Sequence, residues 1–424
     1  MSLNVPDSIV FAPKPAAASA TKVRVSSLPI NGRVFGPSSQ VQFSLPCGRL
    51  GAYLDPRTTF LKFKLVNNAA STGHDLKLDH SAHSAIELLE VFYGSTNLEY
   101  IRGYSALATT LIDCQGNTDR YSKAGTILEG MTDTVREGTT ISKPAAANAP
   151  KIGKTFCIPL ISGVIGTLAE KMLPTGAMTR DSLRVSLTLA NVADIQETAT
   201  ASMDWELQDV QLISEYVHIN ETVARTIESM NPDGIRIPLT SFSLQSNTVP
   251  KDAKSCSLLL SGNFRSVKTI LTIFRLTYNK GTDGEKWASA RINPIKDDGR
   301  WSYDIGGIRV PQREVVGDVE TYKMLELAFH AYSPAEAHGI HTLTEWTGDA
   351  NNEGGFLIGV DLDAYGGKSL LSESGTDVST SSCYFNAEFA QTYTPTGPIT
   401  VDSFFHYDGV LYITPDGSSA RMLV

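Results

Sequence analysis

Alternating apolar and polar residues dominate the chain from end to end, a pattern typical of strands with one buried face. The runs are short and separated by Gly, Pro, Asn or Asp. In the first half they predict strands at Lys22–Ser26, Val41–Leu45, Thr58–Val66, Ile86–Tyr93, Thr155–Leu160, Ser182–Ala190 and Trp205–Ile219. In the second half they predict Ile235–Leu239, Ser255–Leu260, Val267–Tyr278, Tyr303–Val310, Phe356–Leu362, Tyr384–Gln391, Ile399–Phe405 and Val410–Thr414. The sequence therefore predicts an all-β chain built from sandwiches.

Helical patterns are few and local. Apolar residues at helical spacing predict helices at Ile101–Asp113, Val164–Leu173, Glu221–Met230 and Val319–Tyr332. The turn sequence Asn231-Pro232-Asp233-Gly234 ends the third of these helices sharply and predicts a domain boundary.

The two halves end on similar patterns. SLRVSLTLANVAD precedes WELQDVQLISEYVHI in the first half, and YFNAEFAQTYTP precedes ITVDSFFHYDGVLYI in the second. Each pair is an alternating strand, a spacer and a longer β run. Because 424 residues exceed one ordinary core, we expect two similar β-sandwich domains, at 22–230 and 235–424. An Ala/Pro/Ser-rich extended arm is expected at 1–21.

Composition favours an assembling protein over a nucleic-acid binder. Charged residues make up 19% of the chain, against about 25% in typical proteins. Such a low share indicates a high buried fraction or a surface hidden in an oligomer. The net charge is −9 and no Lys/Arg block exists, which argues against sequence-specific or condensing contacts with nucleic acid. No run is long enough to span a bilayer, and no signal peptide is expected.

Histidines near acids are the first candidate chemistry. His74, His80 and His83 lie near Asp75 and Asp79 and could in principle ligate a metal. However, His-x-x-His places two side chains on one face of a helix and not of a strand. Hydrogen bonding in a loop that enters the next strand is the preferred interpretation.

Two further candidates follow the last predicted helix. His330, His338 and His341 lie near Glu336 and Glu345, where a helix C-terminus favours histidine without any metal. The acidic run Thr347–Gly355 resembles a calcium loop, but Val360 stands where such a loop needs its bidentate Glu. A weak cation-binding site on the surface remains an open alternative for this loop.

Nucleophilic catalysis has little support. The five cysteines are Cys47, Cys114, Cys157, Cys256 and Cys383; they contain no C-x-x-C pair and are read as buried free thiols. No G-x-S-x-G is present, and Gly163 and Gly166 form no phosphate-binding loop. We expect no enzyme, no cofactor, and no catalytic, cofactor-binding or metal residues, although a pair of glycosidase carboxylates stays open.

Several strings resemble the major capsid proteins of icosahedral viruses of the double jelly-roll lineage. They are Leu45-Pro46-Cys47-Gly48-Arg49, Tyr53-Leu54-Asp55-Pro56, Phe60–Val66, Ile86–Leu98 with the Tyr104 helix, Phe156–Gly163 and the tail VDSFFHYDGVLYITPDGS. The Cys47 segment is expected to be a corner between two strands, with Asp55-Pro56 turning the chain into the second.

The resemblance implies two consecutive jelly rolls in a structural protein of the virion shell. It implies self-assembly, with three copies forming a pseudo-hexagonal capsomer, and a genome that in this lineage is usually DNA. Other capsid proteins and a host receptor are open as partners. The low charge and the missing basic arm agree with such a shell protein.

Two alternatives remain at the level of sequence. One is a carbohydrate-binding or carbohydrate-active β-sandwich, in which Trp205, Trp287, Trp301 and Trp346 would stack on sugars. The other is a single jelly-roll shell domain followed by a projecting domain, with Asn231–Gly234 as a flexible hinge.

Overall fold

The computed structural model describes residues 19–70, 73–115, 123–132, 137–146, 148–195, 204–277, 286–332, 346, 354–364, 374–393 and 397–424. Strands account for most of the regular structure in these ranges. Within them, no helix is long and apolar enough to cross a membrane.

The first half of the chain folds into two sheets, ordered β1-β11-β4-β9 and β3-β10-β6-β7. These strands are β1 (Ala20–Ser27), β3 (Gln40–Leu45), β4 (Ala52–Asn67), β6 (Ile86–Tyr93), β7 (Thr96–Arg102), β9 (Gly153–Pro159), β10 (Leu183–Leu189) and β11 (Trp205–Ile219). A short β2 (Val34–Phe35) adds to β11, and β5 (Leu76–Asp79) pairs with β8 (Glu137–Ile141). Alternate residues of most strands are buried, as expected when two sheets face each other across a core.

The second half repeats this arrangement with sheets ordered β12-β19-β14-β17 and β13-β18-β15-β16. Its strands are β12 (Ile235–Val249), β13 (Ser255–Leu260), β14 (Val267–Leu276), β15 (Arg300–Ile305), β16 (Ile308–Val316), β17 (Ile358–Asp361), β18 (Cys383–Glu388) and β19 (Ile399–Ile413). A final strand, β20 (Ala420–Leu423), adds to β19.

The two halves have the same topology. Numbered in chain order, the first, eighth, third and sixth main strands form one sheet of each half, and the second, seventh, fourth and fifth form the other. This is the strand order of a jelly roll, in which eight strands make two Greek keys. The predicted all-β fold of two consecutive jelly-roll sandwiches with a few short helices is confirmed.

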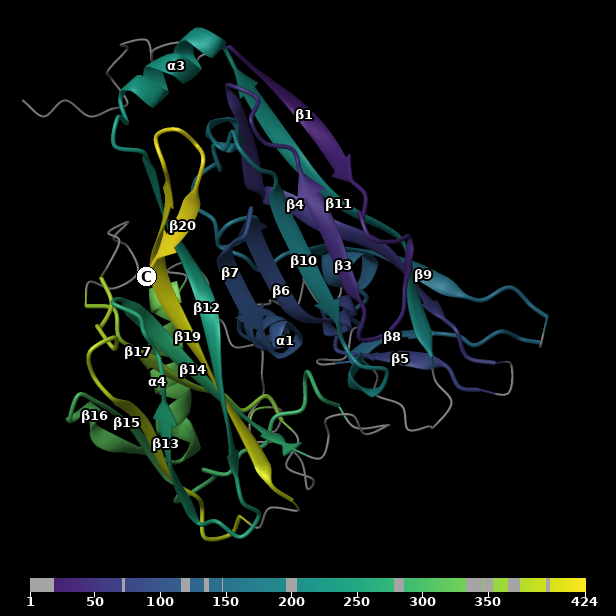
Figure 1. The fold of residues 1–424 in the computed structure, drawn as a ribbon. Coiled ribbons are helices and arrows are strands. Elements are labelled where there is room, and N and C mark those ends of the chain that lie inside the picture. Colours follow the sequence, from purple (N-terminus) through teal and green to yellow (C-terminus); the bar gives the residue numbers. More distant parts are fainter. Residues whose placement is uncertain are drawn as a thin grey trace, which may run out of the picture.

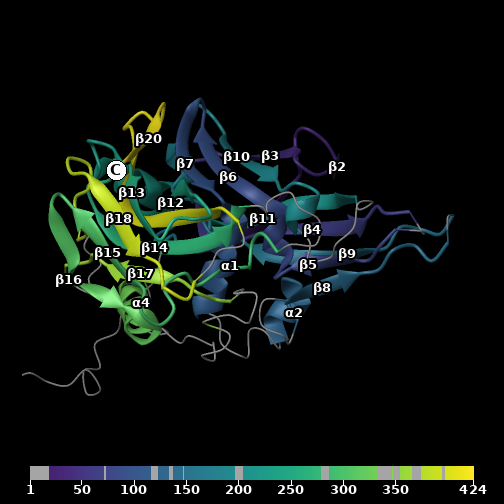
Figure 2. The same ribbon diagram turned by 90° about the horizontal axis from the view of Figure 1, so that it is seen from below.

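The helices lie in the connections between strands: α1 (Tyr104–Gln115), α2 (Gly125–Leu128), α3 (Glu221–Ser229) and α4 (Gly317–Tyr332). Figure 1 shows α3 at one end of the molecule, linking the two sandwiches. The Asn220 side chain caps α3 by accepting from the Thr222 amide at 2.8 Å. In both views α1 lies between the two halves (Figure 1, Figure 2).

No strand in the described ranges pairs across α3. The domain limits expected at 22–230 and 235–424 are compatible with this pairing, but independent folding of the two halves stays a prediction. Residues 1–18 of the arm expected at 1–21 lie outside the described residues. Ala20 and Thr21 already belong to β1, opposite Ile219 and His218.

Strand predictions succeed where alternation is regular and turn residues bound it. Ile86–Tyr93, Trp205–Ile219 and Ser255–Leu260 form strands with the predicted bounds. The helix predicted at Glu221–Met230 is also present, as α3. The predictions at Ile399–Phe405 and Val410–Thr414 are parts of one strand, β19, because Gly409 does not interrupt the pairing with Leu239.

Three local predictions are wrong. Val164–Leu173 is a set of turns and not a helix, because the Thr167 amide folds back to the Leu160 carbonyl at 2.8 Å. The single strand predicted at Tyr303–Val310 is a hairpin of β15 and β16, which turns at Gly306 and Gly307 with φ of 61° and 80°.

The third wrong prediction concerns the turn at Asp55-Pro56. Strand β4 runs through these residues without a break, from Ala52 to Asn67. The register against β11 shifts there, since Asp55 lies opposite Glu215 and Phe60 opposite Ile213. A bulge therefore accommodates Pro56, which has no amide hydrogen to give to the ladder.

Candidate functional site at the contact between the two sandwiches

The most elaborate chemistry in the described residues lies where the two jelly rolls touch. There, β7, α1 and the loop after β9 meet β12, β19 and residues 286–291. We call this region the sandwich contact. Three groups of polar side chains are buried in it, and each joins the first half to the second.

The first group centres on Glu99 of β7. Its Oε1 accepts hydrogen bonds from Ser241 Oγ of β12 at 2.6 Å and from the Gly163 amide at 2.7 Å. Its other oxygen accepts from Ser162 Oγ. The side chain is fully buried, and burial raises the pKa of this carboxyl above its ordinary value, against the lowering effect of the hydrogen bonds.

Because the pKa of Glu99 is raised in the folded state, the folded protein binds its proton more tightly than the unfolded chain does. Its contribution to stability is thus complete below the unfolded pKa of about 4.3 and is lost as pH rises through the folded pKa. We expect Glu99→Gln, which resembles the protonated form, to remove this loss.

Urea unfolding of both proteins between pH 4 and 8 checks this, since the difference between them isolates Glu99 from the other carboxyls. The wild-type free energy of unfolding should fall relative to the variant as pH rises. A difference that stays constant, or grows in the opposite direction, contradicts the assignment.

The second group centres on Asp79, the last residue of β5. Its Oδ2 accepts from the amides of Ala288 at 2.6 Å and Ser289 at 3.2 Å, and its Oδ1 accepts from Ser289 Oγ. Burial also raises the pKa of Asp79. A single carboxyl of the first half thus fixes the position of a loop of the second half.

The third group is a buried ion pair between Asp113 of α1 and Arg291. Asp113 Oδ2 accepts from Arg291 Nη2, while Asp113 Oδ1 lies 3.2 Å from His80 Nε2. Arg291 Nη1 also donates to Thr110 Oγ1 at 2.9 Å. All four residues are buried, so water cannot replace the partners of the Asp113 and Arg291 charges if the halves separate only slightly.

The turn between β19 and β20 forms hydrogen bonds with the first sandwich. The Gly417 carbonyl accepts from Tyr93 Oη at 2.6 Å, and the Asp416 carbonyl accepts from Thr179 Oγ1 at 2.9 Å. Gly417 has φ of 65°, and a Cβ there would lie 2.0 Å from the Ala177 carbonyl oxygen. The last strands of the chain therefore pack against both halves.

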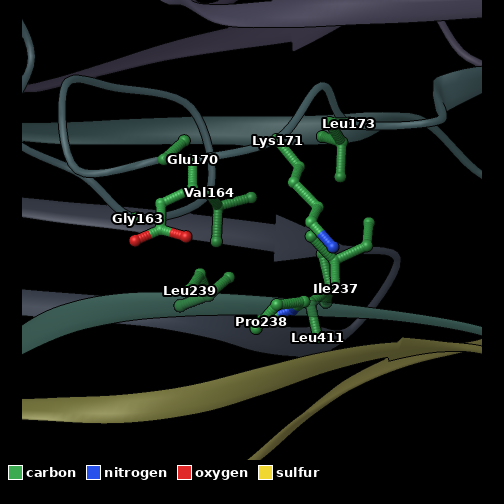
Figure 3. Close-up of a pocket in the computed structure, with 10 residues that line it drawn as sticks. Gly163, Val164, Glu170, Lys171, Leu173, Ile237, Pro238, Leu239 and Leu411 are labelled. Atoms are coloured by element: carbon green, nitrogen blue, oxygen red, sulfur yellow. The ribbon is translucent and has the colours of Figure 1, made fainter. Parts of the chain in front are cut away.

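A small pocket opens beside the Glu99 group, with a cavity volume of about 10 Å³, which is room for at most one water. Figure 3 shows Glu170 and Lys171 on the first-half side and Ile237, Leu239 and Leu411 on the second-half side. A cavity of this size is a packing gap in the contact and cannot hold a substrate.

The structure separates the histidines that the sequence grouped. His74 is exposed, whereas His80 and His83 are buried and lie against different acids, Asp113 and Glu129. No group of three or more His, Cys, Asp or Glu side chains in the described ranges could hold a metal ion. The His330 side chain, His338, His341 and the Thr347–Gly355 loop up to residue 353 lie outside the described residues.

Four of the five thiols are poorly suited to nucleophilic attack. Burial raises the pKa of Cys47 to about 11 and that of Cys114, Cys256 and Cys383 to about 12, so each stays protonated near neutral pH. Cys47 lies beside the end of β3, and its Sγ is 3.7 Å from the Leu45 carbonyl.

The tryptophans proposed to stack on sugars are not on the surface. Trp205, Trp287, Trp301 and Trp346 are all at most 5% exposed. Trp301 donates to Thr321 Oγ1 at 2.9 Å, and Trp287 stacks under the Arg275 guanidinium. The carbohydrate-binding alternative therefore loses the residues on which it rested.

No protein-family model matches the sequence, and no curated protein matches it. Solved structures do match. VP54 of PBCV-1, fitted into a reconstruction of the virophage Sputnik, has a TM-score of 0.63 and 10% identity, over 97% of this chain and 98% of that chain. A chain of the Sputnik virophage structure matches with a TM-score of 0.56 and 13% identity, over 100% of this chain and 91% of that chain. The mavirus major capsid protein matches with a TM-score of 0.51 and 11% identity, over 100% of this chain and 94% of that chain.

The fold is the double jelly roll. The matches extend over both sandwiches of each chain, so the arrangement of one jelly roll on the other is shared as well as the topology of each. In this chain the Glu99, Asp79 and Asp113 groups join the two jelly rolls. The sequence singled out Asp79 and His80 only as residues of a possible metal cluster or of a hydrogen-bonded loop, and it gave no role to Glu99 or Asp113. An acid within an alternating strand gives no signal of whether it faces water or a second sandwich.

Proposed function

We propose that this protein is the structural subunit of an icosahedral viral shell and that it assembles with copies of itself around the genome. The observation that carries the proposal is the double jelly roll, which occupies the whole described chain and matches viral capsid chains over nearly their full lengths. The role of the chain is then structural: it supplies a rigid subunit and the surfaces through which subunits contact one another.

The sandwich contact supports this function because it fixes the two jelly rolls relative to each other, so that they act as one rigid unit. Buried carboxyls that bridge the halves tolerate little relative movement, since any gap leaves a charge or an acceptor without its donor. A flexible hinge at Asn231–Gly234, as in a shell domain with a projecting domain, is disfavoured by the same bonds. We therefore infer that both halves contribute to the shell.

A trimer is the proposed unit of assembly, because three copies of a two-sandwich chain present six similar wedges. Many repeated contacts of modest strength then give a stable shell while misplaced subunits can still leave. Other capsid proteins and a host receptor are further proposed partners. No sequence-specific contact of this chain with nucleic acid is proposed, given its net charge of −9.

Size-exclusion chromatography with light scattering tests the proposal on the purified full chain. The expected species has three times the chain mass of 45.8 kDa, and larger assemblies should appear as the concentration rises or the salt changes. A chain that stays monomeric under all these conditions contradicts the proposal.

The N-terminal segment is proposed to act in assembly and not in folding. Its composition, rich in Ala and Pro, cannot form a core by itself. Deletion of residues 1–18, which leaves β1 whole, is expected to keep the thermal unfolding midpoint and to impair particle formation. Normal particles from the truncated chain contradict this role.

A further inference from the structure

The outer face of the β13-β18-β15-β16 sheet carries a polar hollow. In both views β15 and β16 lie on the side of the second sandwich that faces away from the first (Figure 1, Figure 2). A cavity of about 180 Å³ opens on this face. We call it the outer hollow, and its polar lining consists of Ser255, Arg300, Ser302, Glu314, Asn386 and Glu388.

The strand register explains why this face is hollowed. Ser302 of β15 lies opposite Asn386 of β18, and in the next row of the same face Arg300 lies opposite Glu388. Alternate residues of a strand point to the same side of a sheet, so the short side chains share this face with the long ones. Ser302 and Asn386 therefore form a floor, and Arg300 and Glu388 rise beside it.

The floor carries hydrogen-bonding groups that the protein itself does not satisfy. Ser302 is only 3% exposed and Asn386 is half-buried, yet neither side chain forms a hydrogen bond within the described ranges. A polar group that is nearly buried and has no partner is costly, and such groups are rare in folded proteins. Both side chains are thus available to a polar molecule that enters the outer hollow.

The equivalent sheet of the first sandwich, β3-β10-β6-β7, satisfies its outer face internally. Ser186 of β10 is 1% exposed and accepts from Gln40 Nε2 at 2.7 Å, and Gln40 Oε1 accepts from Gln42 Nε2 at 2.8 Å. The Arg184 guanidinium lies over the Phe92 ring, 4.8 Å from its centroid. An unsatisfied floor is therefore particular to the second sandwich and is not imposed by the jelly roll.

The charges around the outer hollow favour a neutral ligand. Arg300 Nε lies 3.2 Å from Glu388 Oε2, and Arg300 Nη1 lies 3.6 Å from Glu314 Oε2. Glu314 also pairs with Arg309 at 3.2 Å, so a charged ligand would have to compete with existing ion pairs. What the hollow offers is a set of closely spaced donors and acceptors. Such a set suits a molecule with several hydroxyls, because each hydroxyl both donates and accepts.

An exposed aromatic ring lies beside the outer hollow. Tyr384 is 37% exposed and precedes Asn386 by two residues on β18, so both side chains are on the outer face. Across the strands Tyr384 lies opposite Leu259, which is 50% exposed. An apolar ring face next to a polar hollow matches a sugar, which has an apolar ring face and a polar edge.

We propose that the outer hollow binds a neutral carbohydrate, with the hydroxyls of one sugar unit on Ser302, Asn386 and Arg300 and a neighbouring unit on the Tyr384 ring. Pockets that enclose drug-sized ligands measure about 300–1,000 Å³, so a hollow of about 180 Å³ accepts one unit of a longer chain. The stacking residue is Tyr384 and not one of the buried tryptophans. The inference goes beyond shell building and gives the proposed host receptor a chemical class.

An array of immobilised oligosaccharides, probed with the labelled full chain, tests the site. Neutral oligosaccharides of hexoses and N-acetylhexosamines should be bound, and sialylated or sulfated ones should not. The neutral oligosaccharide that binds most tightly is then titrated calorimetrically against Asn386→Ala and Tyr384→Ser. Each variant should weaken binding at least about tenfold, with the thermal unfolding midpoint unchanged. Tyr100→Ser is the matched control, since Tyr100 is 49% exposed on the equivalent sheet of the first sandwich and its loss should leave binding intact.

Three results would overturn the inference. If no neutral oligosaccharide is bound, or if both variants bind as the wild type does, the site is wrong. Preferential binding of the acidic oligosaccharides contradicts the ligand class. Assembled particles should bind the same oligosaccharide, and binding by dispersed subunits alone contradicts a receptor role. Because the outer hollow lies within one sandwich of one copy, a chain that fails to assemble refutes the proposed function without affecting this measurement.

Discussion

Replacing Arg291 by alanine is expected to lower the free energy of unfolding by about 3–5 kcal/mol, because it leaves Asp113 buried without its cation. Arg291 also donates to Thr110, so the same change leaves a second group of α1 without its partner. Urea unfolding followed by circular dichroism measures the loss. Both the arginine and the carboxylate are fully buried, which is why the effect should be far larger than for a surface pair.

The matched control is Arg300→Ala, which removes solvent-exposed pairs with Glu388 at 3.2 Å and with Glu314 at 3.6 Å. That change should cost less than about 1 kcal/mol. The double variant Arg291→Met/Asp113→Leu should recover much of the loss of the single variant, since no buried charge of the pair is left alone. A single-variant loss no greater than that of Arg300→Ala contradicts the assigned role of the ion pair.

Replacing Gly163 by alanine should have the second large effect, by forcing the two sandwiches apart. A Cβ at Gly163 would lie 2.1 Å from the Thr240 carbonyl oxygen, a backbone atom of β12 that cannot rotate away. The Gly163 amide would move with it and lengthen its bond to Glu99. We expect a loss of about 2–4 kcal/mol, above the usual range for overpacking because a buried hydrogen bond is lost as well.

Gly36→Ala is the control for this change, because a Cβ at Gly36 would have no heavy atom within 4 Å. Urea unfolding compares the two variants, and hydrogen exchange locates the damage. For Gly163→Ala, faster exchange should appear in the loop after β9 and in β12 before it appears in β3 or β10. Equal stability of the two variants contradicts a close contact at this point.

Much of the fold could be predicted because jelly-roll strands obey a local rule. Trp205–Ile219 alternates in two runs that are offset at Asp209, where the pairing with β4 shifts, and its bounds still follow from the sequence. The similar endings of the two halves proved informative too. They are the seventh and eighth strands of each jelly roll, β10 and β11 in the first and β18 and β19 in the second.

Two of the three wrong predictions share a physical cause, which is that contacts with distant parts of the backbone override the local pattern. The apolar spacing of Val164–Leu173 fits a helix, yet this segment turns sharply beside the second sandwich, where Gly163 and Gly166 approach other backbone atoms closely. Asp55-Pro56 is a common turn pair, but a long partner strand, β11, held it in the sheet through a bulge.

The sandwich contact could not be predicted, because its partners are far apart in sequence. Glu99 and Ser241 are separated by 142 residues, and Asp113 and Arg291 by 178. Each acid lies in a local pattern that is equally compatible with a solvated position. Only the packing of one jelly roll on the other decides that these charges are buried.

In the proposed function, the whole double jelly roll builds a closed shell. Cryo-electron microscopy of assemblies formed by the purified chain tests it most directly. We predict uniform, roughly spherical particles in whose walls both sandwiches of every copy take part. Dispersed monomers, or walls made from 22–230 with 235–424 projecting outward, would contradict it.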